Sequence, residues 1–111
     1  MAEKIKFESI IDELREKTAG FDASNYYNFL AIQVTLKDLK KALYVEIKDG
    51  KLSIEPYEYN DRQANIIMTS TNFIKLINGK LDKMLALATG KLRIEGDLGK
   101  ASELSNLFSK K

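Results

Sequence analysis

The stretch Ser70–Gly99 reads STNFIKLINGKLDKMLALATGKLRIEGDLG, and the rest of the chain is organised around it. Its glycines separate two short apolar segments from a third, Lys91–Glu95, in which charged and apolar residues alternate. Glycine readily adopts the left-handed conformation that ends a helix, and alternation is typical of a half-buried strand. We therefore predict two short helices, ending at Gly79 and Gly90, and then a strand. The two helices hold more apolar side chains than one buried face needs, and this surplus is the main functional indication in the chain.

The residues upstream predict one amphipathic helix and most of a sheet. Over residues 4–18 the apolar side chains recur at helical spacing, at Phe7, Ile10, Ile11 and Leu14. Apolar and polar residues alternate over 26–36, 42–48 and 51–55, and Asp49-Gly50 favours a type I′ hairpin turn. These three segments predict an antiparallel meander, and residues 64–69 predict a fourth strand. The segment 56–63, with the only proline, is expected to be a solvated loop.

Side chains that can cap a helix stand before each of the later helices. Ser70 or Thr71 is expected to cap the first, Asp82 the second and Asp97 the last, whose apolar stripe reaches Phe108. Strands and helices are segregated along the chain, which predicts the α+β class. The expected fold is a five-stranded, mainly antiparallel sheet with four to five helices packed on one face. A chain of 111 residues is expected to form a single domain, residues 1–111.

The composition excludes several kinds of chemistry. With no cysteine and no histidine, the chain has no disulfide, no Cys/His zinc site and no Ser-His-Asp triad. The glycines do not form a nucleotide-binding motif, and a tight turn explains Gly96-Asp97-Leu98-Gly99 better than an anion site does. A net charge of +2 without a basic stripe does not favour nucleic acid as a partner. We expect no enzymatic activity, no metal and no cofactor, and a cytoplasmic protein, since the N-terminal residues resemble neither a signal peptide nor a membrane span.

Two interpretations of the apolar surplus stay open from the residues alone. The side chains can fill a compact core, or the sheet and helices can enclose a cavity for an apolar ligand. With a filled core, the protein would be an interaction module, homodimeric or bound to a lipid-metabolising enzyme, and Tyr44, Tyr57 and Tyr59 would be exposed at the interface. The helix over residues 4–18 either caps the core or docks transiently on a membrane surface, although its acidic residues disfavour strong anchoring to anionic lipid.

The order of residues in the last third resembles the sterol carrier protein type two family. The similar features are the helix Phe73–Ile77 with its closing Gly79, the short helix around Ala86, and Gly90-Lys91-Leu92-Arg93-Ile94-Glu95-Gly96 before a polar helix start. Asp82-Lys83 replaces the Asn-Pro that the family often has, and the C-terminal Phe108-Ser109-Lys110-Lys111 differs from a peroxisomal Ser-Lys-Leu signal. The resemblance thus suggests a stand-alone cytoplasmic, prokaryotic member.

The resemblance implies non-enzymatic binding, and transfer, of a hydrophobic ligand in an apolar tunnel between the sheet and the helices. The ligand would be a fatty acid, an acyl-CoA, a phospholipid or a sterol-like lipid. On this basis the residues expected to line the cavity are Ile32, Val34, Val45, Phe73, Ile77, Leu81, Met84, Leu85, Leu87, Ala88, Leu104 and Phe108.

Overall fold

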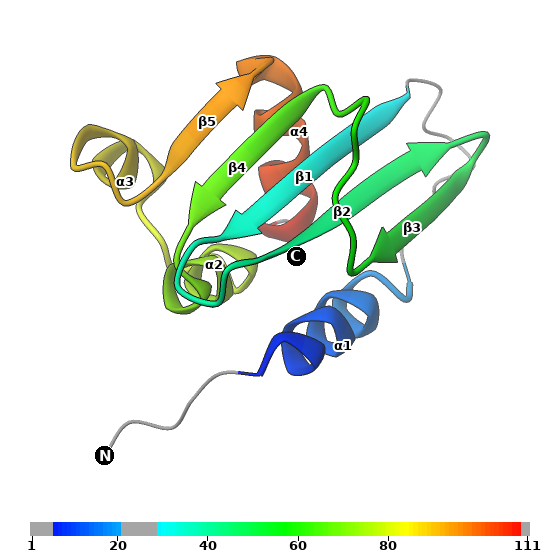
Figure 1. Ribbon diagram of the computed structural model, residues 1–111, viewed down its shortest axis with the longest axis horizontal. Coiled ribbons are helices and arrows are strands. Elements are labelled where there is room, and N and C mark those ends of the chain that lie inside the picture. Colours follow the sequence, from blue (N-terminus) through cyan, green and yellow to red (C-terminus); the bar gives the residue numbers. More distant parts are fainter. Residues whose placement is uncertain (1–5, 21–28, 110–111) are drawn as a thin grey trace.

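The structure is a computed structural model in which residues 6–20 and 29–109 are described. Five strands form one sheet in the order β3-β2-β1-β4-β5 (Figure 1). Their bounds are Leu30–Leu36 for β1, Lys41–Lys48 for β2, Lys51–Glu55 for β3, Ala64–Met68 for β4 and Arg93–Gly96 for β5. The described part of the chain also forms four helices, α1 Phe7–Lys17, α2 Ser70–Ile77, α3 Lys83–Ala88 and α4 Leu98–Ser109. The predicted α+β class is confirmed. The beginning of the first predicted strand, residues 26–28, lies outside the described residues.

The first three strands form the predicted meander. β1 pairs antiparallel with β2, and β2 with β3. Asp49 and Gly50 have φ of 54° and 76°, the two positive values that a type I′ turn requires. The sheet is mixed rather than wholly antiparallel, because β4 pairs parallel with β1 in the register Val34 to Ile66. β5 then pairs antiparallel with β4 at the edge of the sheet.

The helices pack against one face of the sheet, where a single hydrophobic core lies. α4 runs behind β1 and β4, while α1 lies next to β3 at the other end of the sheet (Figure 1). The predicted stripe of α1, which includes Ile10 and Leu14, is buried in this core. Arg15 fixes α1 to the edge strand, since its Nη2 donates to the carbonyl of Ile54 at 2.7 Å and pairs with Glu55 at 3.2 Å.

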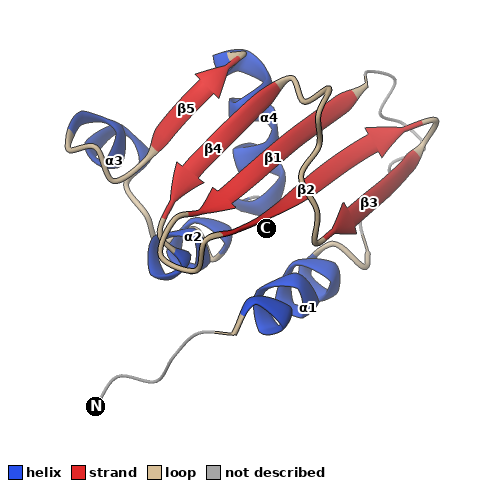
Figure 2. Cartoon of the chain, in the orientation of Figure 1, coloured by secondary structure: helices blue, strands red, loops and turns tan. Residues whose placement is uncertain are grey.

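The segment between β3 and β4, residues 56–63, crosses the opposite face of the sheet (Figure 2). The Tyr59 N–H donates to Gln33 Oε1 at 3.1 Å, and the Tyr59 hydroxyl donates to Glu46 Oε2 at 2.7 Å. The Gln63 N–H donates to the Ala31 carbonyl at 2.7 Å. Six of the eight residues of this segment are exposed, as expected for a solvated loop, whereas Tyr59 and Gln63 are half-buried. The segment covers β1, which explains why the polar Gln33 is buried on the face away from the core.

Tyr44, Tyr57 and Tyr59 are not all exposed, as an interface built on the three tyrosines would require. Tyr44 and Tyr59 are half-buried and pack edge to face, with ring centroids 5.0 Å apart. Tyr57 alone of the three is exposed. An interface built on all three tyrosines is thus not available on the surface of this chain.

The bond from Tyr59 to Glu46 makes stability depend on pH. Together with burial, this hydrogen bond raises the pKa of Tyr59 from 10.0 to about 12. The stabilisation is therefore fully present below pH 10 and is lost between pH 10 and pH 12 as the phenol ionises. We expect Tyr59→Phe to lower the free energy of unfolding by about 1–2 kcal/mol at pH 7, because it removes a hydrogen bond to a charged group. The difference from the native protein should shrink above pH 10 in urea denaturation. A constant difference across that range would contradict the assignment.

The helix ends follow the predicted chemistry with one correction. Asp82 caps α3, accepting from the Leu85 N–H at 3.1 Å, and Asp97 accepts from the Lys100 N–H at 3.1 Å at the start of α4. The cap of α2 is Thr69, one residue before the two candidates that the sequence suggested. Ser70 is instead bound to the carboxylate of Asp38, through both its N–H and its hydroxyl. This contact ties the β1–β2 turn to the start of α2.

Candidate functional site

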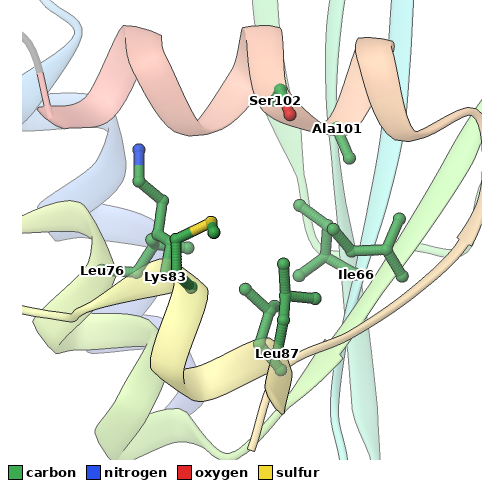
Figure 3. A pocket seen from close by; sticks show the side chains of 9 residues that line it. Ile66, Leu76, Lys83, Leu87, Ala101 and Ser102 are labelled. Atoms are coloured by element: carbon green, nitrogen blue, oxygen red, sulfur yellow. The ribbon is translucent and has the colours of Figure 1, made fainter.

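An apolar cavity lies between α3, α4 and the edge of the sheet formed by β4 and β5 (Figure 3). Its volume is about 230 Å³. The lining comes from five elements (α2, α3, α4, β4 and β5) and from the residue before β5, and most of its surface is hydrocarbon. The lining residues are Ile66, Leu76, Lys83, Met84, Leu87, Leu92, Ile94, Ala101 and Ser102.

The local sequence explains why space remains here. α3 has only six residues, and Ala86 alone among them is buried. The backbone holds α3 close to the sheet edge at one point, where the Leu92 N–H donates to the Ala86 carbonyl at 3.1 Å. On the opposite wall α4 presents Ala101 and Ser102, two small side chains that leave the volume unfilled. A short helix with one buried residue facing small side chains therefore leaves an apolar cavity, open to solvent beside the exposed Met84 and Leu87, instead of a packed core.

Two of the residues expected from the sequence, Met84 and Leu87, line this cavity. Leu81 is partly buried against the core, while Leu85 and Ala88 of the same region are exposed. The side chain of Phe108 lies outside the described part of the structure. The remaining six are packed within the hydrophobic core, with at most 1% of their surface exposed: Ile32, Val34, Val45, Phe73, Ile77 and Leu104.

The sequence placed the sheet wall at Ile32, Val34 and Val45 and the α4 wall at Leu104 and Phe108. In the structure the cavity is lined on these sides by other residues, Ile66, Ile94, Ala101 and Ser102. Leu92 and Ile94 are the apolar residues of the alternating segment Lys91–Glu95, but nothing in the sequence indicated that they face a space. The signal that could have indicated it is the pair Ala101 and Ser102, two small residues on one face of α4. Leu98 lies three and four positions before them, on the same face.

Lys83 is the charged residue among the nine that line the cavity. In Figure 3 its amine points toward α4, away from Leu87 and Ile66. The cavity thus combines a hydrocarbon wall with a cation at one side. Such a site can hold an apolar chain with an acidic head group, but it offers no acid-base pair for catalysis.

Among the residues that the structure describes, no group of three or more His, Cys, Asp or Glu residues could hold a metal ion. Within the same residues, none of the helices has the length and hydropathy needed to span a bilayer.

The chain belongs to the SCP-2 sterol transfer family, whose family model matches residues 8–109. Over 63 residues it is 36% identical to sterol carrier protein 2 of Homo sapiens, a match that covers 57% of this chain and 12% of the human protein. The chain therefore corresponds to a small part of that relative's length.

Solved structures agree with the fold. Sterol carrier protein-2 like-3 from Aedes aegypti superposes with a TM-score of 0.74 at 21% identity, covering 97% of this chain and 100% of that one. The palmitated SCP2L2 of the same mosquito gives a TM-score of 0.64 at 15% identity, over 94% of this chain and 95% of that one. The resemblance inferred from the glycine-framed stretch Ser70–Gly99 is confirmed.

Proposed function

We propose that this protein is a non-enzymatic carrier that binds the hydrocarbon chain of a single-chain lipid in the cavity between α3 and α4. The observation that carries the proposal is the apolar lining, with Met84 and Leu87 on a helix that has only one buried residue. Methionine and leucine side chains adapt their rotamers to a variable chain. Membership of the SCP-2 sterol transfer family supports a lipid as ligand, and the palmitated relative supports a fatty acyl chain.

The size of the cavity favours a flexible chain over a rigid ring system. Its 230 Å³ is somewhat below the roughly 300–1,000 Å³ of typical ligand pockets. A flexible acyl chain can place part of its length in such a space and leave the rest along the exposed side of α3. A rigid fused-ring sterol has to fit into the space as a whole. Lys83 beside the cavity suits the carboxylate of a fatty acid.

The energetics suit a carrier that must also release its ligand. Burying a methylene group contributes about 0.8 kcal/mol, so a dozen of them give on the order of 10 kcal/mol. The translational and rotational entropy that the ligand loses on binding offsets several kcal/mol of this burial free energy. We expect dissociation constants in the micromolar range.

Titration of the purified protein with a fluorescent fatty acid tests the proposal. We expect saturable binding, displacement by palmitate and weaker displacement by cholesterol. Organic extraction followed by mass spectrometry should also recover a fatty acid from freshly purified protein. The proposal is wrong if no lipid is extracted and the fluorescent fatty acid does not bind at tens of micromolar, well above the expected dissociation constant.

A further inference from the structure

A set of exposed apolar side chains surrounds the cavity. Four large hydrophobic residues are exposed on α3 and at the first position of α4, and we refer to them as the α3 patch: Met84 at 80%, Leu85 at 60%, Leu87 at 43% and Leu98 at 59%. Met84 and Leu87 also line the cavity. Leu98 shares one face of α4 with Ala101 and Ser102, which line the opposite wall. Exposed apolar residues of the α3 patch therefore lie beside the cavity on both α3 and α4.

The stretch of chain that carries the α3 patch has more basic than acidic residues, although its Lys100 pairs with Glu103 at 3.4 Å. The stretch Lys75–Lys100 contains six basic and three acidic residues, whereas the rest of the chain has twelve basic and thirteen acidic ones. The net positive charge of the protein thus comes from this stretch. Lys80 and Lys91 flank α3 and are exposed, while Asp82 and Asp97 accept hydrogen bonds from the backbone as helix caps.

The other helix considered for membrane contact is not available for it. The apolar stripe of α1, Phe7 to Leu14, is buried against the sheet, and Arg15 holds the helix to β3. The exposed side of α1 carries Glu8, Asp12 and Glu16, which an anionic surface repels. Docking through α1 would require this helix to leave the core.

We propose that the α3 patch docks on an anionic membrane surface, with Leu85 and Leu98 entering the lipid interface and Lys80 and Lys91 near the lipid phosphates. The proposal rests on the proposed function, because docking in this orientation turns the cavity toward the bilayer. A lipid chain then moves between membrane and cavity along Met84 and Leu87 without crossing water. Charge complementarity identifies the partner as an anionic lipid surface, since basic residues beside exposed apolar ones are the pattern that such surfaces bind.

Flotation with lipid vesicles tests the docking independently of ligand binding. Delipidated protein is mixed with vesicles of phosphatidylcholine alone, or of phosphatidylcholine and phosphatidylglycerol in equal parts. We expect binding to the anionic vesicles that weakens as salt is added. Lys91→Glu should lower the partition coefficient about fivefold or more, because it replaces a basic charge at the surface with an acidic one. Leu98→Ser should lower it about five- to tenfold, from the loss of apolar burial.

Two variants serve as controls far from α3, one for the charge reversal and one for the loss of a large exposed side chain. Lys51→Glu reverses an exposed lysine at the β2–β3 turn, and Tyr57→Ser removes an exposed aromatic side chain after β3. Both lie toward the β3 edge, at the opposite side of the sheet from β5. They should bind vesicles as the native protein does. Equal losses in the α3 variants and the controls would overturn the proposal, as would equal binding to neutral and anionic vesicles.

The outcomes separate docking from ligand binding. If the α3 variants lose vesicle binding but bind fluorescent fatty acid normally in solution, the docking proposal is supported. If they bind vesicles normally while native protein binds fatty acid, docking through α3 is overturned and the carrier function stands. If vesicle binding depends on the patch but no fatty acid binds, the carrier function fails alone. If sedimentation velocity finds a dimer that Leu98→Ser dissociates and no vesicle binding, the patch is an interface between copies and the proposal is overturned.

Discussion

Gly96→Ala is expected to lower the free energy of unfolding by about 3 kcal/mol or more, from backbone strain together with steric overlap. Gly96 has φ of +95°, a conformation that alanine rarely adopts, and a Cβ built there lies 2.6 Å from the carbonyl oxygen of Gln63. That oxygen cannot simply move away, because it accepts a hydrogen bond from the Asp97 N–H at 2.9 Å. Urea denaturation should report the loss as a lower midpoint without a change in slope.

Gly79→Ala is the matched control for Gly96→Ala. Gly79 has φ of +70°, also positive, but a Cβ there meets nothing within 4 Å. Its substitution therefore carries only the conformational cost, about 1–2 kcal/mol. The difference between the two variants measures the contact with Gln63. Equal losses at both positions would contradict a steric role for Gly96 in holding β5 beside β4.

The elements predicted well from the sequence are those that local chemistry specifies. Asp49-Gly50 specifies its own hairpin, and the alternation in 42–48 specifies which side of β2 faces the core. Asp82 and Asp97 identify the starts of α3 and α4 because a cap requires only a side-chain oxygen and a nearby N–H group. The glycine-framed order of these elements was also enough to recognise the family.

The features that were missed depend on contacts between distant parts of the chain. The parallel pairing of β1 with β4 joins residues about thirty positions apart, and no local pattern encodes a partner. Ser70 looked like a helix cap because its bond to Asp38 could not be foreseen. The burial of Gln33 depends on where the 56–63 segment crosses the sheet.

The cavity itself was only partly predictable for a related reason. Hydrophobicity indicates that Phe73 and Met84 both avoid water, but it cannot tell which of them packs against neighbours and which faces a space. Phe73 is in the filled core, and Met84 is at the cavity. The distinction arises from the space between α3 and α4, which the small side chains of Ala101 and Ser102 leave unfilled.

Ser102→Trp is expected to abolish fatty acid binding while leaving the fold intact. Ser102 lines the cavity and is itself exposed, so an indole can enter the 230 Å³ space without displacing core side chains. Affinity for the fluorescent fatty acid should fall more than tenfold, because loss of burial for even two or three methylene groups accounts for that factor. The free energy of unfolding should change by less than about 1 kcal/mol, since the substitution is at the surface.

The native chain contains no tryptophan, so the introduced indole reports its own position. If the side chain fills the cavity, its emission should be shifted to shorter wavelength than that of Ser9→Trp, a control at an exposed position on α1. Ser9→Trp should bind the fatty acid as the native protein does. A buried indole in Ser102→Trp combined with native affinity would mean that the lipid binds elsewhere, because the cavity cannot hold both groups at once.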